Sequence, residues 1–324
     1  MTYSLVDVER WRYSIFRKLN CQDRENALSR ALDTLETLLL ASINKQISEF
    51  SRPAGRGFEA GEPLGGRGAV TTNALLEARG VRKRFGAVEA LRGASFSINA
   101  GEVVALMGDN GAGKSTLIKT ICGVHSPDEG EILFHGQSIA GRTPSEIHGM
   151  GIETVYQDLA LAPDLDTAAN LYLGREVLAK GVLGWFGVLN RKKMAGHAQQ
   201  VLTDLNVNIK DPAAPVAMLS GGQQQSVAVA RAVTWANELV IMDEPTAALG
   251  VPQTRAVLDL IRRVRDSGRS VVLISHSLPD VLAVSDRIEV LRLGTRVARL
   301  TTKDTTEEQI VGAMTGAFTS EEAE

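Results

Sequence analysis

One short segment, GDNGAGKST over residues 108–116, has the residue types needed to bind phosphate groups. Gly108 is followed after four residues by Gly113, Lys114 and Ser115, which is the spacing of a phosphate-binding loop. Glycines let backbone N–H groups turn inward around an anion, and the N-terminus of the helix that follows adds partial positive charge. The lysine can reach the outer phosphates, and the serine hydroxyl can ligate Mg²⁺. The apolar VVALM before the segment and LIKTICGV after it predict the required strand and helix, so we expect a nucleotide site.

Two adjacent acids, Asp243 and Glu244, follow the apolar run LVIM and precede Pro245. Carboxylates at the edge of a buried segment cost free energy unless a positive partner binds there. In a phosphate-loop site, an acid that ends a second apolar strand holds Mg²⁺ beside the loop. Asp243 suits that role, and Glu244 is then free to polarise the water that attacks the γ-phosphorus. The pair therefore predicts a site that hydrolyses its nucleotide as well as binding it.

The composition is that of an ordinary globular protein. Of 324 residues, 44% are hydrophobic and 23% are charged, which allows a well-buried core. The net charge of −3 indicates no general attraction to nucleic acid or to anionic lipid. Cys21 and Cys122 supply neither a disulfide framework nor metal-ligand spacing, so we expect two free thiols. The N-terminus lacks the apolar region of a secretory signal, and no apolar run approaches the roughly 18 residues of a membrane span.

Short apolar segments rich in β-branched residues predict strands that are covered on both faces of a largely parallel sheet. They span residues 103–108, 152–157, 239–244 and 270–275. Helical stretches such as 114–123 and 252–267 lie between them. Alternation of this kind predicts an α/β domain.

The N-terminal part of the chain has a different character. Apolar residues recur at spacings of three and four over 24–50, which predicts an amphipathic helix that packs either on this chain or on a partner. Residues 51–74 contain six glycines and two prolines, which predicts a flexible linker. We therefore expect a helical extension over 1–50, a linker over 51–74, a compact domain with the nucleotide site over 75–318 and an acidic tail over 319–324.

Further motifs, in their order along the chain, resemble those of ATP-binding cassette proteins. LSGGQQQ at 219–225 resembles the signature sequence of that family, Gln157 falls at its glutamine loop and His276 at its switch histidine. DEPTAAL resembles the segment from the catalytic acid to the dimer-contact loop, and Phe85 takes the place of the aromatic residue that stacks on adenine. The resemblance covers roughly residues 75–315. It implies a P-loop NTPase (RecA-like) core with a mostly parallel sheet, an antiparallel β part and a helical signature subdomain at about 158–232.

The same resemblance implies a role for each site residue. Glu244 serves the attacking water, His276 contacts the γ-phosphate, and Gln157 touches both the Mg²⁺ and the water. The implied Mg²⁺ ligands are Ser115, Gln157 and Asp243. The implied contacts to ATP are Phe85, Gly108, Asp109, Asn110, Gly111, Ala112, Gly113, Lys114, Ser115, Thr116, Ser220, Gly221, Gly222 and Gln223.

The Ser220 segment is a second candidate anion site, because a serine and two glycines open a helix there. One chain does not need two phosphate sites for one nucleotide. The family resemblance implies that this segment of one subunit closes over ATP held by the loop of the other. The working unit is then a head-to-tail dimer with two ATP molecules in its interface.

The sequence of the helical subdomain and of the segment before it indicates a narrower group within the family. ETVYQDLALAPDLDTAANLYLGRE and GWFGVLNRKKM resemble the importer ATPases for simple sugars of the ribose, xylose and fructose type. This implies an ATP-hydrolysing subunit on the cytoplasmic face of the cell (inner) membrane, docked on transmembrane permease subunits and served indirectly by a periplasmic or extracellular sugar-binding protein. With one cassette, the chain pairs with itself or with another cassette, and no nucleic-acid partner is implied. A soluble cassette ATPase without a permease and the ATPase of an exporter remain alternatives.

Two features depart from the family pattern. Gly250 stands where most cassettes place an aspartate that contacts the opposite subunit. Glycine at this position agrees with the simple-sugar group, but any contact borrowed from the aspartate version is in doubt. Residues 1–74 resemble nothing in the group, and are either an accessory module or the product of an over-extended translation start.

Overall fold

The computed structural model of the chain describes residues 74–317, except for the side chains of residues 182 and 183. The helix predicted at 24–50, the linker up to residue 73, the acidic tail and Cys21 lie outside the described residues. Cys122 is a buried free thiol, and burial raises its pKa to about 11. Among the described helices, none is long and apolar enough to cross a membrane.

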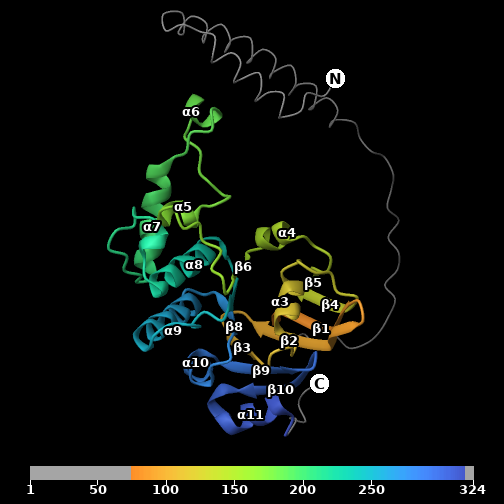
Figure 1. The fold of residues 1–324 in the computed structure, drawn as a ribbon. Helices are drawn as coiled ribbons and strands as arrows, with labels where there is room; N and C mark the ends of the chain where they lie inside the picture. Colours follow the sequence, from red (N-terminus) through yellow and green to blue (C-terminus); the bar gives the residue numbers. More distant parts are fainter. Residues whose placement is uncertain (1–73, 318–324) are drawn as a thin grey trace, which may run out of the picture. The chain divides into compact units, whose positions relative to one another are not determined.

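A six-stranded sheet in the order β10-β9-β3-β8-β7-β6 forms the centre of the described domain (Figure 1). Its strands are β3 (Val103–Met107), β6 (Ile152–Val155), β7 (Leu239–Asp243), β8 (Ser270–Ile274), β9 (Arg287–Arg292) and β10 (Thr295–Thr301). Neighbouring strands pair in parallel, except that β10 pairs antiparallel with β9. The predicted mostly parallel sheet is confirmed.

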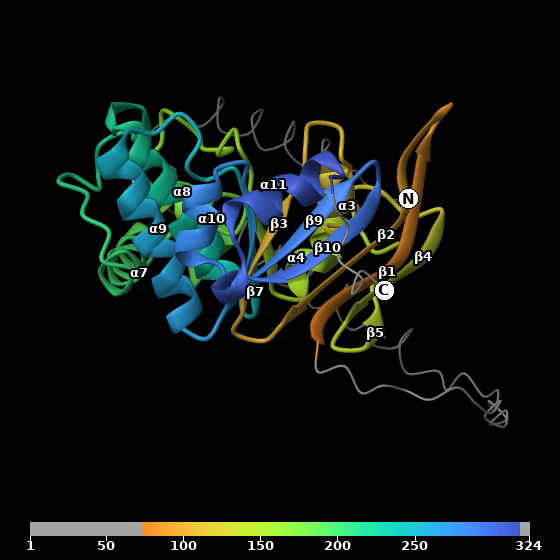
Figure 2. The same cartoon turned by 90° about the horizontal axis from the view of Figure 1, so that it is seen from below.

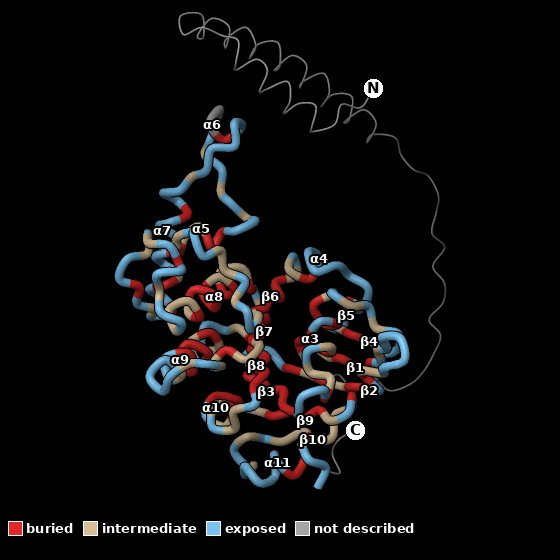
Figure 3. The backbone as a smooth tube through the Cα atoms, in the orientation of Figure 1, coloured by how far each residue is buried: buried red, intermediate tan, exposed pale blue. Residues whose placement is uncertain are grey.

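The apolar runs are continuous because both faces of this sheet are buried. All five residues of β3 are buried, and they alternate between two cores. Ala105 and Met107 pack in one core with the helices, whereas Val104 and Leu106 pack in the other with the antiparallel strands. One strand thus holds two layers together (Figure 3).

The second layer is a four-stranded antiparallel sheet in the order β2-β1-β4-β5, which confirms the predicted antiparallel part. Its strands are β1 (Ala74–Phe85), β2 (Val88–Asn99), β4 (Glu129–Phe134) and β5 (Gln137–Ser138). Helices α3 (Lys114–Ile121) and α4 (Pro144–Gly149) contribute Leu117, Ile118 and Ile147 to the core that this sheet shares with β3.

The opposite face of the central sheet is covered by helices, which Figure 2 shows from below. These are α8 (Gly221–Trp235), α9 (Val251–Asp266), α10 (Leu278–Val284) and α11 (Glu307–Thr315), and a 3₁₀ turn, η2 (Thr302–Asp304), precedes α11. Apolar residues on α9, among them Val257, Ile261 and Val264, recur at spacings of three and four and are buried. The helix predicted at 252–267 is therefore present, shifted by one residue.

The predicted helical insert at about 158–232 is less continuous than its sequence suggests. It contains α5 (Thr167–Leu171), α6 (Val182–Trp185), α7 (Arg191–Asp204), the 3₁₀ turn η1 (Val216–Met218) and most of α8. The connection before α5 is held by fully buried Asn170. Its amide accepts from the Ala162 N–H at 2.8 Å and donates to the Ala162 and Leu165 carbonyls at 3.0 and 3.1 Å. The backbone groups of this loop are therefore satisfied by a buried side chain rather than by the hydrogen bonds of a regular helix.

Candidate active site

Residues 108–113 form the loop between β3 and α3 that the sequence predicts. Gly108, Gly111 and Gly113 have φ values of 145°, 84° and 104°, which L side chains rarely adopt. A Cβ at Gly108 would overlap the carbonyl oxygen of Leu291, and one at Gly113 would lie 2.9 Å from the carbonyl oxygen of Ala90. The glycines are therefore required by backbone angle and by close approach of neighbouring segments.

Lys114 begins α3 and turns its ammonium group back over this loop. Its Nζ donates to the carbonyl oxygens of Gly108 at 2.5 Å and Asp109 at 3.2 Å. Burial lowers the pKa of Lys114, while the nearby charges of Glu244, Asp109 and Asp243 act in the opposite direction. A half-buried cation between a glycine loop and two carboxylates suits a group that carries several negative oxygens.

The parallel register brings the ends of four strands to one edge of the sheet. Val155 of β6 pairs with Met242 of β7, and Ile274 of β8 pairs with both Asp243 and Leu106 of β3. The segments that follow these strands carry Gln157, Asp243 with Glu244, His276 and the glycine loop. The structure thus places these sequence-predicted residues at the same edge, where α/β sheets bind ligands.

Asp243 ends β7 in surroundings that disfavour its ionised form. Burial and the charge of Glu244 raise its pKa, and Lys114 and Lys119 offset only part of that shift. Ser115 is exposed in the first turn of α3, and Gln157 is exposed in the turn after β6. Hydroxyl, amide and carboxylate oxygens are the donors that Mg²⁺ prefers. Within residues 74–317 no group of three or more His, Cys, Asp or Glu gathers around a metal position. Ser115, Gln157 and Asp243 together supply these three kinds of oxygen.

Glu244 is held in an unusual backbone conformation. Its φ is 50°, and its N–H donates to the Ile274 carbonyl at 2.9 Å. Its Oε2 lies 2.8 Å from Nδ1 of His276. Non-glycine residues with positive φ cost free energy and cluster at functional sites. The strained turn lets Asp243 end the strand while Glu244 faces the histidine.

Phe85 lies at the end of β1, with 43% of its surface exposed. Its ring meets His125 edge-on at a centroid distance of 5.0 Å, and Lys83 Nζ lies 5.7 Å from its centroid. The ring is therefore supported on one side and open to stacking on another. His125 is a contact that no local sequence signal indicated.

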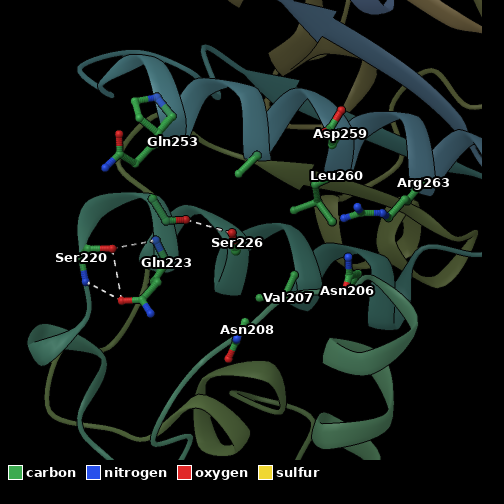
Figure 4. Close-up of a pocket in the computed structure, with 13 residues that line it drawn as sticks. Asn206, Val207, Asn208, Ser220, Gln223, Ser226, Gln253, Asp259, Leu260 and Arg263 are labelled. Atoms are coloured by element: carbon green, nitrogen blue, oxygen red, sulfur yellow. Dashed lines mark hydrogen bonds between the residues drawn. The ribbon is translucent and has the colours of Figure 1, made fainter.

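The signature residues form an N-terminal cap on α8. Ser220 Oγ accepts from the Gln223 N–H at 3.4 Å, and Gln223 Oε1 accepts from the Ser220 N–H at 3.0 Å (Figure 4). The first N–H groups of a helix have no partner inside the helix, so those of Gly221 and Gly222 remain donors for an anion. Helices α8 and α3 lie on opposite faces of the central sheet, because the buried residues of α8 belong to one core and those of α3 to the other (Figures 1 and 2). The signature and the phosphate loop of one chain are thus separate sites.

A cavity of about 420 Å³ opens between α8 and α9, next to the signature residues rather than at the phosphate loop (Figure 4). The side chain of Gln253, on α9, borders the cavity and packs against Gly222 and Gly250. A Cβ at Gly222 would approach Gln253 Cγ to 2.9 Å, and one at Gly250 would approach its Oε1 to 2.8 Å. Gly250 itself has an ordinary φ of −74°. Its small size therefore makes room for Gln253, a neighbour that the sequence did not reveal.

Sequence reasoning also missed a hydrogen bond between the segment that follows Asp243 and Glu244 and a helix that follows β8. Thr246 Oγ1 donates to Asp280 Oδ2 at 2.7 Å, and the Ser277 N–H donates to Ser275 Oγ at 3.0 Å. The first bond joins the segment after β7 to α10, which follows β8, and the second lies within the turn between β8 and α10. Thr246 and Asp280 are 34 residues apart in the chain, so no local sequence pattern predicts their contact.

The fold and the strand-end residues define the class of protein as a phosphate-loop ATPase. Comparison with known proteins identifies the family within this class. A family model described as ABC transporter matches residues 91–247. The chain is 50% identical over 245 residues to the fructose import ATP-binding protein FrcA of Rhizobium meliloti, covering 75% of this chain and 94% of that protein.

Two other comparisons agree. The chain is 48% identical over 241 residues to the xylose/arabinose import ATP-binding protein XylG of Sulfolobus acidocaldarius, covering 74% of this chain and 94% of that one. A crystal structure of an ATP-binding cassette of an ABC transporter, in its ADP conformation, superposes with a TM-score of 0.63 at 28% identity and covers 75% of this chain and 96% of that one. The chain belongs to the ABC transporter family and contains its ATP-binding cassette.

Proposed function

We propose that this chain is the ATP-hydrolysing subunit that powers import of a monosaccharide through a partner membrane permease. The observation that carries the catalytic part is the contact between Glu244 and His276 at the ends of β7 and β8. The names of the relatives, which are import ATP-binding proteins for fructose and for xylose or arabinose, support the transport part.

The phosphate loop holds the outer phosphates of ATP in this proposal. Backbone N–H groups of residues 108–116 and the start of α3 face the anion, and Lys114 supplies a charge near the β- and γ-phosphates. Phe85 offers its open face to the adenine ring. The lowered pKa of Lys114 reflects burial that the phosphates would compensate.

Mg²⁺ would be held by Ser115, Asp243 and Gln157, whose oxygens suit its coordination. The ion would supply positive charge beside the phosphate oxygens that these residues approach. The raised pKa of Asp243 is the observation that supports a cation at this position, because a cation would favour the ionised carboxylate.

Glu244 accepts a proton from the attacking water, because its carboxylate is held at the strand end with 16% of its surface exposed. His276 is 73% exposed, and its Nδ1 contacts Glu244. Its Nε2 can also donate to the γ-phosphate when both ring nitrogens carry a proton. Gln157, in the turn after β6, orients the water. As Glu244 takes the proton, the water oxygen bonds to the γ-phosphorus, the bond from this phosphorus to the bridging oxygen breaks, and ADP leaves.

A second copy completes the site. The separation of α8 from α3 within one chain supports a head-to-tail dimer, in which Ser220, Gly221, Gly222 and Gln223 of one subunit cover the ATP of the other. ATP then closes the dimer and hydrolysis opens it. The permease at the cytoplasmic face of the membrane converts that motion into sugar movement, and a periplasmic or extracellular sugar-binding protein delivers the sugar.

The test combines catalysis with partner identity. ATP hydrolysis by the purified chain should disappear in Lys114→Ala, since the phosphates lose their cation. The native protein should co-purify from membranes with an integral permease, and a sugar should stimulate hydrolysis in the reconstituted complex. Co-purification with ribosomes alone would favour a soluble ATPase, and outward sugar movement would favour an exporter.

A further inference from the structure

The outer end of the helical subdomain is a narrow hairpin formed by residues 177–190. The Ala179 N–H donates to the Val188 carbonyl at 2.7 Å and the Asn190 N–H to the Val177 carbonyl at 2.7 Å, and Leu178 pairs antiparallel with Leu189. Helix α6 caps this hairpin at its tip (Figure 1). The tip extends beyond α5 and α7 and is largely exposed (Figure 3).

The tip carries large apolar side chains that the domain does not bury. Trp185 is 53% exposed, Phe186 44%, Leu178 51% and Val188 44%. The Trp185 and Phe186 rings contact each other edge-on at a centroid distance of 5.1 Å. Exposed apolar residues are unremarkable singly, but adjoining ones on a projecting element mark a contact surface.

The charge around the tip has one sign. No aspartate or glutamate occurs from residue 177 to residue 203, although the chain as a whole has a net charge of −3. Lys180 at the hairpin and Arg191, Lys192 and Lys193 at the start of α7 are all exposed. No described residue forms an ion pair with any of these four cations. The apolar tip is therefore flanked by four exposed cations, and the only acid that adjoins the hairpin in the sequence is Glu176 at its base.

We infer that the tip of this hairpin, residues 178–189, contacts the anionic surface of the membrane, with Trp185 and Phe186 entering the headgroup region and the flanking cations facing lipid phosphates. Tryptophan is enriched at membrane interfaces, and lysine clusters bind anionic leaflets. Lysine is depleted at protein–protein interfaces, so the pattern fits lipid better than a protein groove. The inference rests on the proposed function only in placing the chain at a membrane.

The contact gives the subunit a second attachment beside its permease. A weak lipid anchor at the helical subdomain restricts that end of the chain to the membrane plane and raises its local concentration near the permease. The cation cluster makes this attachment sensitive to salt, since screening weakens it within a Debye length.

The test is co-sedimentation of the full chain with vesicles. We expect binding to vesicles of equimolar phosphatidylcholine and phosphatidylglycerol, and much weaker binding to phosphatidylcholine alone. Trp185→Ser combined with Phe186→Ser should weaken binding about tenfold, because the apolar part of the anchor is lost. Lys192→Glu combined with Lys193→Glu should weaken binding to anionic vesicles to a similar degree.

Matched controls separate the tip from the rest of the surface. Leu293→Ser with Val311→Ser changes two other exposed apolar residues, 60% and 44% exposed, and Lys210→Glu with Lys303→Glu reverses two exposed lysines elsewhere. Both should bind vesicles as the parent does. Equal losses in the controls, or unchanged binding of the tip variants, would overturn the inference.

Measuring ATP hydrolysis in solution distinguishes a failure of this inference from a failure of the proposed function. Tip variants should hydrolyse ATP at the parental rate, because the tip does not contact the strand ends that carry the catalytic residues. A parent without ATPase activity would defeat the proposed function whatever the vesicles show. Tip variants that bind vesicles normally but lose stimulation by a reconstituted permease would show that the tip docks on protein, which overturns the lipid contact.

Discussion

Glu244 and His276 meet across the ends of β7 and β8, with Oε2 of the acid 2.8 Å from Nδ1 of the histidine. The acid is mostly buried and the imidazole is mostly exposed. The contact depends on the positive φ of Glu244 and on the bond from its N–H to Ile274. The Glu244 carboxylate is thus held by the sheet through its backbone N–H and by His276 through its side chain, which suits the proton-accepting role that we propose for it.

Replacing Glu244 by Gln should lower kcat for ATP hydrolysis by about 10²–10⁴-fold, because a positioned proton acceptor contributes in that range. The affinity for ATP should change little, since Gln keeps the size of the side chain and one accepting oxygen. Steady-state hydrolysis and equilibrium binding of a fluorescent ATP analogue measure the two quantities. His276→Ala should add little to the loss in the double variant, since residues that act as a unit are not additive. Normal turnover of Glu244→Gln would remove this residue from the mechanism.

Asp243→Asn should stabilise the nucleotide-free, Mg²⁺-free protein while abolishing Mg²⁺-dependent hydrolysis. The folded chain raises the pKa of Asp243, so it binds this proton more tightly than the unfolded chain, and the ionised form costs stability. The cost is absent below the unfolded pKa of about 3.9 and grows as pH rises toward the folded pKa. We expect the variant to unfold a few °C higher at neutral pH, with the difference vanishing toward pH 4, as measured by thermal melts across pH. A lower melting temperature of the variant at neutral pH would contradict this.

Gly108→Ala should destabilise the fold much more than Gly111→Ala. Both glycines have positive φ, so each substitution carries backbone strain of about 1–3 kcal/mol. Only the new Cβ at position 108 would meet another segment, the carbonyl of Leu291, whereas the one at position 111 would meet open space. Chemical denaturation measures the free energy of unfolding of each variant. Because both carry backbone strain, the difference between them reports the overlap of the Cβ at position 108 with the Leu291 carbonyl. Equal loss of stability would mean that β9 moves away without cost.

Phe85→Ala should raise KM for ATP about 3–10-fold, since an aromatic stacking pair is worth about 0.5–1.5 kcal/mol. The ring is 43% exposed, so the melting temperature should change little. Phe85→Trp, which keeps an aromatic face, is the matched control and should retain the parental KM. A large loss of stability in Phe85→Ala would show instead that the contact with His125 holds the strand.

Gly250→Asp should fold normally, because the φ of −74° is ordinary and the new Cβ meets only the end of the Gln253 side chain. Asp and Gly differ by a few tenths of a kcal/mol as helix N-caps, so the melting temperature should stay close to that of the parent. Displacing Gln253 from Gly222 should lower ATPase activity, and Gln253→Ala should show the same loss without changing Gly250. A variant with full activity would show that Gln253 does not support the signature segment.

The sequence by itself determined the residue types at each strand end and their order along the chain. It predicted the glycine loop with Lys114, the two acids after β7 and the histidine after β8, because these depend on local pattern. It also predicted the α/β fold, since the apolar runs of buried parallel strands are visible in the sequence. The predicted strands ended one or two residues too late, as with 103–108 against β3, because Gly108 leaves the sheet with a φ of 145°.

Only the tertiary structure decided which distant residues meet. The Leu291 carbonyl behind Gly108, Asp280 beside Thr246 and Gln253 across Gly222 join segments from different parts of the chain. The insert before α8 was predicted as more helical than it is, because Pro163 and several glycines break it and buried Asn170 organises its loop. Such contacts depend on how the two sheets and their helices pack, and packing is a property of the whole domain rather than of any local pattern.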